Sequence, residues 1–244
     1  MDRYSRHISL PEIGGEGQLR LSSAKAVVVG AGGLGSPVLY FLASAGIGHI
    51  KIIDSDVVDI TNLNRQIIHF EDDVGRNKSQ SAKEKLNQYN RNIQVCAANV
   101  MLNDENAMEH LPGNDIVMSC VDNIKTRYLL NNACVRSGIP FIDGGTQGFE
   151  GYILTVVPGI TPCYQCIFPI LPQKEQVRQT GGIGVLGAAA GTLGSMMALE
   201  AIKYIIGIPI TSYLHYVDLL SFRITPVTAA RDANCPACVS AGGV

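Results

Sequence analysis

Residues 26–36 read AVVVGAGGLGS, and this stretch decides the expected fold. A run of apolar, mostly β-branched residues leads into Gly30, Gly32 and Gly35, which fit the spacing G-x-G-x-x-G. In that arrangement glycines permit a tight turn between a strand and a helix, and the helix N-terminus can receive a phosphate. Asp54 ends the next apolar run about 20 residues later, where a carboxylate can bind ribose hydroxyls. The stretch therefore predicts a nucleotide site without choosing the nucleotide.

The rest of the first half alternates between strand-like and helix-like patterns. We expect strands over 25–29, 48–54, 93–100, 115–120 and 140–143, and helices over 34–45, 78–90 and 125–137. This alternation predicts an α/β, Rossmann-like, mostly parallel sheet with helices on both faces. Three later runs are typical of antiparallel strands and cover 152–158, 214–220 and 221–227. A Gly- and Ala-rich helix is expected over 187–206, between the first of these runs and the second.

No linker rich in proline or charge interrupts the chain, so we expect a single domain over 1–244. An amphipathic arm over 1–23 precedes a nucleotide-binding half over 24–150 and a second half over 151–244. The composition, with 46% hydrophobic and 16% charged residues, favours a large core and an apolar subunit interface. A net charge of −2 without a basic cluster gives no indication of nucleic-acid binding.

The chain also gives no indication of membrane insertion. Two stretches lack charge, over 26–50 and 180–199, but several glycines interrupt both. Glycine-rich backbone facing lipid would be costly. The N-terminus lacks the apolar core of a signal peptide, so we expect a cytoplasmic protein.

The loop after Asp54 favours a triphosphate over a dinucleotide. Lys78 opens the next helix, and the loop itself carries several polar side chains; these are Asp56, Asn62, Asn64, Arg65 and Gln66. A dinucleotide does not require a fixed arginine and lysine here, whereas three phosphates need cationic donors. Either cation alone could equally be an ordinary solvated charge.

Asp122 and Asn123 follow the fourth expected strand. In an open parallel sheet, ligands bind beyond the carboxyl ends of the strands, so Asp122 should face the same crevice as the glycine turn. Its carboxylate would suit Mg²⁺.

Two C-x-x-C pairs lie in the second half, Cys163 with Cys166 and Cys235 with Cys238. Four thiolates in two pairs can form a closed tetrahedral zinc site, which would clip the C-terminal tail onto the domain. Disulfides or redox motifs are the alternatives, and a cytosolic setting and the paired spacing disfavour them. We expect the other three cysteines to be buried and inert; these are Cys96, Cys120 and Cys134.

The ordered motifs resemble those of a known family. These are RYSRHI near the start, GAGGLGS, DSDVVDITNLNRQ, GRNKSQ, VDN, CYQC, GTLGSMMALEAIK and CPAC. Together they resemble the ThiF/MoeB/HesA family of ubiquitin-activating-like adenylyltransferases along essentially the whole chain. The resemblance implies a homodimer that uses ATP and Mg²⁺ to adenylate the C-terminal glycine of a small ubiquitin-like sulfur carrier ending in Gly-Gly. Carrier-AMP and pyrophosphate would be the products, and the second half would bind the acceptor.

The same resemblance implies roles for individual residues. Gly33 would contact the nucleotide through its backbone, and Asp54 would bind the ribose. Asn62, Arg65 and Lys78 would contact the triphosphate. Asp122 would organise Mg²⁺, and Arg6 would reach into the partner subunit's site. The expected nucleotide site also includes Gly30, Gly32, Gly35, Asp56, Asn64, Gln66 and Asn123. The five histidines receive no role.

Many members of the family carry a cysteine in the loop before the Gly- and Ala-rich helix, where it can form a thioester or persulfide link with the carrier. Thr180 occupies that position here, and no cysteine lies between Cys166 and Cys235. A threonine hydroxyl without an adjacent base is a poor nucleophile. We therefore expect the reaction to stop at the acyl-adenylate.

Three alternatives stay open at this point. An NAD-dependent oxidoreductase would share the glycine turn and Asp54 but would leave the cysteine pairs and three charged residues unexplained; these are Arg65, Lys78 and Asp122. A non-catalytic zinc-clipped scaffold would not need those charged residues. Within adenylation, the acceptor could be a small-molecule or peptide carboxylate, and the sequence does not separate a thiamine route from a molybdopterin route.

Overall fold

The computed structural model describes residues 2–170, 184–210 and 213–239. Within these residues eight strands form one sheet in the order β3-β2-β1-β4-β5-β6-β7-β8. The strands are β1 Lys25–Val29, β2 His49–Ile53, β3 Gln94–Ala98, β4 Ile116–Ser119, β5 Phe141–Gln147, β6 Glu150–Val156, β7 Leu214–Asp218 and β8 Arg223–Pro226. Pairing is parallel from β3 to β5 and antiparallel from β5 to β8. The predicted mostly parallel sheet with an antiparallel extension is confirmed.

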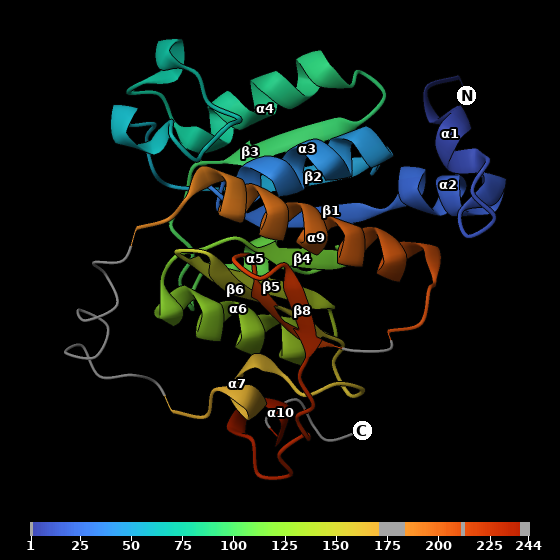
Figure 1. Ribbon diagram of the computed structural model, residues 1–244, viewed down its shortest axis with the longest axis vertical. Coiled ribbons are helices and arrows are strands. Elements are labelled where there is room, and N and C mark those ends of the chain that lie inside the picture. The colour runs from blue at the N-terminus through green and yellow to red at the C-terminus, as the bar shows by residue number, and fades with distance from the viewer. Residues whose placement is uncertain (1, 171–183, 211–212, 240–244) are drawn as a thin grey trace.

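Helices cover both faces of the sheet (Figure 1). One face carries α3 Gly35–Ala45, α4 Lys78–Tyr89 and α9 Gly187–Ile206, and the other carries α5 Ala107–His110, α6 Ile124–Ser137, α7 Tyr164–Ile167 and α10 Pro236–Val239. Two 3-10 turns lie between β2 and α4; these are η2 Ile60–Asn62 and η3 Glu71–Asp73. No helix in the described ranges is long and apolar enough to cross a membrane.

The central strand β1 is buried on both faces. Ala26 and Val28 pack into the cluster beneath α3 and α9, while Val27 and Val29 pack into the cluster beneath α6. A strand covered on both sides needs apolar residues at every position, which is why this run does not alternate with polar residues. The continuous apolar run thus marks the centre of the sheet.

Strand β5 is longer than the sequence predicted, because it continues past Asp143 to Gln147 and pairs with β6. Two glycines in the extension, Gly144 and Gly145, are weak strand formers and hid it. They are needed for close packing: a Cβ on Gly144 would lie 2.4 Å from the Sδ atom of Met197 in α9. Packing against α9 therefore overrides the local propensity.

Cys96 corrects a second expectation. Its side chain is exposed on β3, whereas Cys120 and Cys134 are buried as predicted. β3 is the edge strand, and its buried residue Val95 points to the opposite face from its neighbour Cys96.

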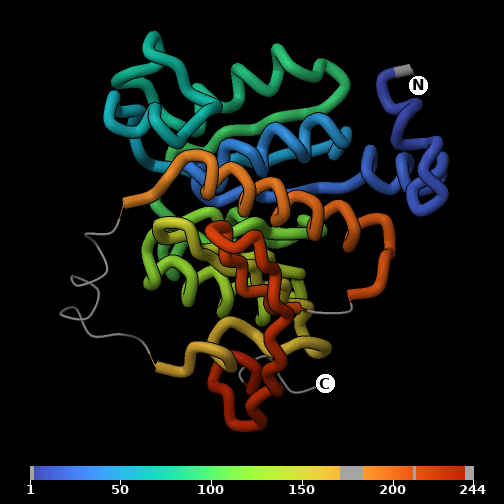
Figure 2. Tube along the Cα trace, in the orientation of Figure 1, coloured from blue at the N-terminus to red at the C-terminus, as the bar shows by residue number. Residues whose placement is uncertain are grey.

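The N-terminal arm contains η1 Asp2–Tyr4, α1 Ser5–Ile8 and α2 Gly14–Ser23. Helix α2 leads directly into the start of β1, and Tyr4 packs against Gly46, just before β2. The arm therefore lies at the amino ends of the parallel strands, at the opposite end of the sheet from the glycine turn (Figure 2).

Candidate active site and metal centre

The glycine turn lies between β1 and α3, and two of its glycines are required by packing. Gly30 has φ +94°, and a Cβ there would lie 2.6 Å from the carbonyl oxygen of Cys120, just after β4. A Cβ on Gly35 would lie 1.9 Å from the carbonyl oxygen of Gly30. Only glycine fits at either position. These two residues shape the turn and bring it against the end of β4.

The Ala31 peptide groups within this turn are held from both sides. The Ala31 amide donates to Oδ2 of Asp54 at 2.7 Å, and its carbonyl oxygen lies 2.9 Å from Nε2 of His69. A carbonyl can only accept, so Nε2 carries the proton. Nδ1 of His69 lies 2.9 Å from the Ser81 hydroxyl. The side chains of Asp54 and His69 therefore both hydrogen-bond to the backbone of the glycine turn.

Burial sets the ionisation of both side chains. It raises the pKa of Asp54, although two backbone amides hydrogen-bond to the carboxylate and oppose the shift. It also lowers the pKa of His69, which favours a neutral imidazole. A neutral His69 accepts from Ser81 through Nδ1 while donating through Nε2. No role for this histidine was predictable from the sequence, because its partner Ala31 lies 38 positions earlier.

The two predicted cations reach the same edge of the sheet. Lys78 is buried, and its Nζ pairs with Oδ2 of Asp56 at 2.9 Å. The side chain of Asp56 is itself exposed to solvent. Arg65 donates to the carbonyl oxygen of Thr61 at 3.0 Å and to Oδ1 of Asn64 at 3.1 Å. A buried lysine needs a counter-charge, and Asp56 supplies it in this state.

The loop that carries these residues packs beside the outer part of the turn. A Cβ on Gly33 would lie 3.6 Å from Cγ of Arg65, and one on Gly32 would lie 3.6 Å from Nε2 of Gln66. Gln66 is buried, and its Oε1 has no hydrogen-bond partner among the described residues. Asn62 is half-buried at the end of η2. The loop and the glycine turn therefore form one structural unit.

The segment after β4 contributes Asp122 and Asn123. Asp122 is exposed, and within the described parts of the chain its carboxylate forms no ion pair or hydrogen bond. An unpaired carboxylate at the carboxyl edge of the sheet is a suitable ligand for Mg²⁺. Oδ1 of Asn123 accepts from the Thr126 amide at 2.8 Å and so caps α6. Helix capping therefore accounts for Asn123, and its expected contact with the nucleotide stays a prediction.

Two predicted residues are not brought into this cluster. Arg6 is exposed on the arm, at the amino ends of the strands, so its own chain's glycine turn is out of its reach. Thr180 lies outside the described residues.

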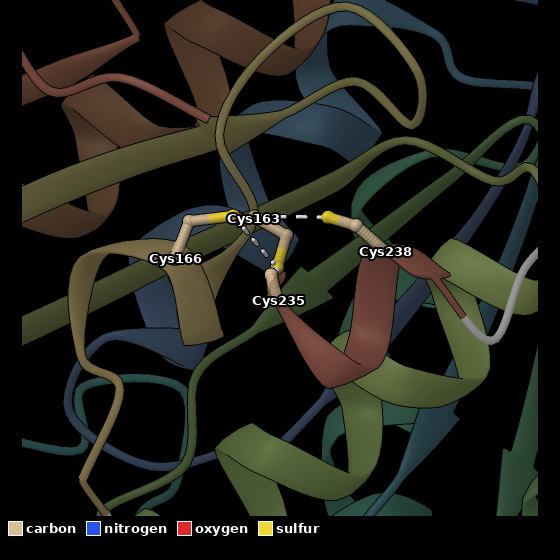
Figure 3. A group of neighbouring side chains, drawn as sticks. All are labelled: Cys163, Cys166, Cys235 and Cys238. Atoms are coloured by element: carbon tan, nitrogen blue, oxygen red, sulfur yellow. Dashed lines mark hydrogen bonds between the residues drawn. The ribbon is translucent and has the colours of Figure 1, made fainter. Parts of the chain in front are cut away.

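Four cysteines form a separate cluster between α7 and α10 (Figure 3). The Sγ atom of Cys163 lies 3.7 Å from that of Cys166 and 3.6 Å from that of Cys235, and Cys166 lies 3.7 Å from Cys238. All four sulfurs lie within 4.8 Å of one another. A tetrahedral zinc site with Zn–S bonds of about 2.3 Å would place its sulfurs about 3.8 Å apart. The cluster therefore has the geometry to bind zinc.

The fold and these two sites define a Rossmann-type protein with a candidate nucleotide site and a four-cysteine cluster. The chain matches the ThiF family over residues 4–237 and belongs to that family. Curated relatives include the SAMP-activating enzyme E1 of Haloferax volcanii, 40% identical over 99% of this chain and 90% of the relative. The sulfur carrier protein adenylyltransferase of Thermus thermophilus is also 40% identical, over 98% of this chain and 90% of its own length.

Other similar proteins are longer than this chain. The adenylyltransferase and sulfurtransferase MOCS3 of Drosophila sechellia is 45% identical over 84% of this chain, which covers only 45% of MOCS3. Among solved structures, Escherichia coli MccB with ATP has a TM-score of 0.85 and 28% identity, covering 97% of this chain and 74% of MccB. Nearly all of this fold is therefore shared with a protein solved with ATP.

Proposed function

We propose that the protein is an ATP-dependent adenylyltransferase that activates the C-terminal glycine carboxylate of a small ubiquitin-like sulfur carrier. The observation that carries this proposal is that two cations lie near the glycine turn. Arg65 packs beside Gly33, and the charge of Lys78 acts on Asp54, which holds the Ala31 amide. An NAD site has no need of that charge, whereas ATP does. Relatives named as a SAMP-activating enzyme and a sulfur carrier protein adenylyltransferase support the choice of acceptor.

The nucleotide would lie along the carboxyl edge of the sheet. Gly33 would contact it through the backbone, Asp54 would bind the ribose, and Asn62, Arg65 and Lys78 would contact the phosphates. The supporting residues around them would be Gly30, Gly32, Gly35, Asp56, Asn64, Gln66 and Asn123. Asp122 would hold Mg²⁺, which would neutralise charge on the phosphates when bound.

In the reaction, a carboxylate oxygen of the carrier attacks the α-phosphorus of ATP. The bond between the α-phosphorus and its bridging oxygen breaks, and pyrophosphate leaves with the electron pair. The negatively charged reactants repel each other, so the protein contributes mainly positioning and preorganised positive charge. No side chain has to act as a nucleophile.

We propose further that the enzyme forms no thioester with the carrier. The loop position at Thr180 lacks a thiol, and burial raises the pKa of the thiols of Cys120 and Cys134. A thiol that stays protonated is a weak nucleophile. A separate sulfur donor or other acceptor would then take the acyl group from the adenylate.

We propose that the active form is a homodimer in which Arg6 acts on the partner subunit's site. The position of the arm, far from its own glycine turn, supports this arrangement. A groove of about 380 Å³ on the α3, α4 and α9 side exposes Phe41, Ile67 and Tyr89. An exposed apolar face of this kind is typical of a subunit interface.

The test is ATP–pyrophosphate exchange with purified candidate carriers that end in Gly-Gly. Exchange should require Mg²⁺ and the carrier, and Asp122→Ala should lower its rate by orders of magnitude because metal organisation is lost. Calorimetry should detect ATP binding and no NAD binding. Exchange by Asp122→Ala at the wild-type rate would show that the assignment of Asp122 is wrong.

A further inference from the structure

A buried arginine lies beneath the segment that carries Asp122. Arg127 belongs to the first turn of α6, and only 8% of its side chain is exposed. Its Nη1 donates to Oδ2 of Asp143 at 2.5 Å and to the carbonyl oxygen of Gly144 at 2.8 Å. Its Nη2 donates to the carbonyl oxygen of Val121 at 2.6 Å. One guanidinium therefore joins the middle of β5 to the residue before Asp122.

Asp143 and Tyr152 hold this guanidinium in place. The Asp143 carboxylate is fully buried, and the Tyr152 hydroxyl donates to its Oδ2 at 2.6 Å while accepting from Nη1 of Arg127 at 2.7 Å. Burial lowers the pKa of Arg127, but the Asp143 carboxylate together with the neighbouring Tyr152 and Tyr164 raises it overall. The arginine is thus charged, paired and confined to one orientation.

The contact with Val121 fixes the backbone at Asp122. The peptide bond is planar, so holding the Val121 carbonyl oxygen also sets the direction of the Asp122 amide. On the other side, Asn123 is held as the cap of α6. Asp122 is exposed, yet fixed residues bracket it on both sides.

We propose that Arg127, locked by Asp143 and Tyr152, is a positioning residue that presents the Asp122 carboxylate to the magnesium–triphosphate complex. The inference rests on the proposed function, because it takes Asp122 as the metal ligand. A loop carboxylate that is already oriented loses less entropy when it binds a metal. The network touches neither substrate nor metal and acts only through the backbone of Val121.

The test uses two conservative variants, because truncating Arg127 would leave Asp143 buried without a partner. Arg127→Lys keeps the positive charge, but lysine has a single terminal nitrogen and cannot donate to Asp143 and Val121 at once as the two guanidinium nitrogens do. Tyr152→Phe keeps the ion pair and removes one hydroxyl. Tyr128→Phe is the matched control, because Tyr128 lies next on the same helix and its hydroxyl bonds to the carbonyl of Phe168.

Two readouts separate positioning from a purely structural role. Hydrogen exchange at residues 121–124 is measured without nucleotide or metal and should be faster in Arg127→Lys and unchanged in Tyr128→Phe. The Mg²⁺ concentration for half-maximal ATP–pyrophosphate exchange should rise about tenfold or more in Arg127→Lys, as for other residues that orient a metal ligand. Tyr152→Phe should move both quantities in the same direction by less.

The outcomes distinguish this inference from the proposed function. Asp122→Ala tests the proposed function, and a normal Mg²⁺ dependence in that variant would overturn both. If Asp122→Ala loses its Mg²⁺ response while folded Arg127→Lys keeps wild-type Mg²⁺ dependence and exchange, only the positioning role is wrong. Should Arg127→Lys fail to fold, Tyr152→Phe decides by the same two measurements.

Discussion

At the scale of single residues, Ala31 is the point from which the glycine turn is organised. Its amide is held by Asp54 and its carbonyl oxygen by His69, which in turn contacts Ser81. These contacts fix the peptide planes that lead into Gly32 and Gly33, whose backbone would face the nucleotide. The geometry of the turn therefore depends on side chains that would not touch ATP themselves.

Replacing His69 with Ala should destabilise the protein by about 1–3 kcal/mol, because the buried carbonyl of Ala31 loses its donor. His69→Gln should cost less, since the glutamine amide can donate in the same direction. Urea unfolding of both variants checks the ranking. Equal losses in the two variants would show that the imidazole packing, rather than the hydrogen bond to Ala31, supplies the stability.

His69 also predicts a pH dependence. Burial lowers the pKa of His69 in the folded state below its ordinary value of 6.5, so the unfolded chain binds the proton more tightly. The stability contributed by the neutral imidazole is fully present above pH 6.5 and falls as the pH drops below it toward the folded pKa. Unfolding measured at pH values on both sides of 6.5 should show this slope in wild type and a weaker slope in His69→Gln.

Residues with a fixed place in a local pattern were predictable from the sequence. Asp54 directly follows a strand at the expected distance from the glycines, and Lys78 begins a helix. The contact between His69 and Ala31 and the one between Arg127 and Asp143 were not predictable. Each joins separate elements, and nothing in the local sequence states which elements become neighbours.

At the scale of elements, helix α9 is packed through its glycines. Its bounds agree with the predicted 187–206, because its apolar and small residues continue without interruption. A Cβ on Gly194 would lie 2.5 Å from the carbonyl oxygen of Leu34 and 2.4 Å from Cγ of Pro37, at the start of α3. Close approach of α9 to α3 therefore depends on glycine at position 194.

Gly194→Ala should destabilise the fold by about 1–3 kcal/mol, because the added methyl group meets backbone that cannot move aside. A Cβ on Gly191 in the same helix would meet no atom within 4 Å apart from the neighbouring backbone of α9. Gly191→Ala should therefore leave stability unchanged or raise it by up to about 1 kcal/mol through helix propensity. Denaturant unfolding of the two variants makes the comparison, and similar losses in both would contradict this description of the packing.

The end of β5 shows why element bounds were harder to predict than element types. Local propensity favoured a stop at Asp143, since Gly144 and Gly145 follow. The contacts with β6 and α9 extend the strand instead, and these partners lie later in the chain. Pairing across the sheet thus decided where the strand ends.

At the scale of the whole molecule, the four-cysteine cluster connects the segment after β6 to the segment after β8. Cys163 and Cys235 are 72 positions apart, and both are buried in the cluster beneath α6. A metal at this point would close the second half of the chain on itself. The cysteine spacing predicted the cluster because metal-ligand pairs follow a local rule.

Elemental analysis should find one Zn²⁺ per chain, and Cys235→Ser should release it and lower the stability of the fold. Chelation should first increase hydrogen exchange near α10, because α10 is held to the domain by this cluster. If hydrogen exchange rises uniformly along the chain, the metal does not act by holding α10 locally to the domain. Activity that survives in folded, metal-stripped protein would confirm a structural role.

If Arg6 acts on the partner subunit's site, two inactive variants should complement each other in a mixed dimer. Arg6→Ala and Lys78→Ala proteins should each be inactive, and a mixed dimer should recover activity because one of its two sites is intact. Activity of the mixture after verified subunit exchange is the measurement. If no activity returns, Arg6 does not act across the interface.

The most direct test of the central claim is the intact mass of a Gly-Gly carrier after incubation with enzyme, ATP and Mg²⁺. We expect the carrier to gain one adenylyl group while the mass of the enzyme stays unchanged under non-reducing conditions. A carrier lacking its terminal glycine and the Asp122→Ala enzyme should both give unmodified carrier. ATP turnover with an unmodified carrier, or an enzyme–carrier conjugate that thiols cleave, would contradict the proposed reaction.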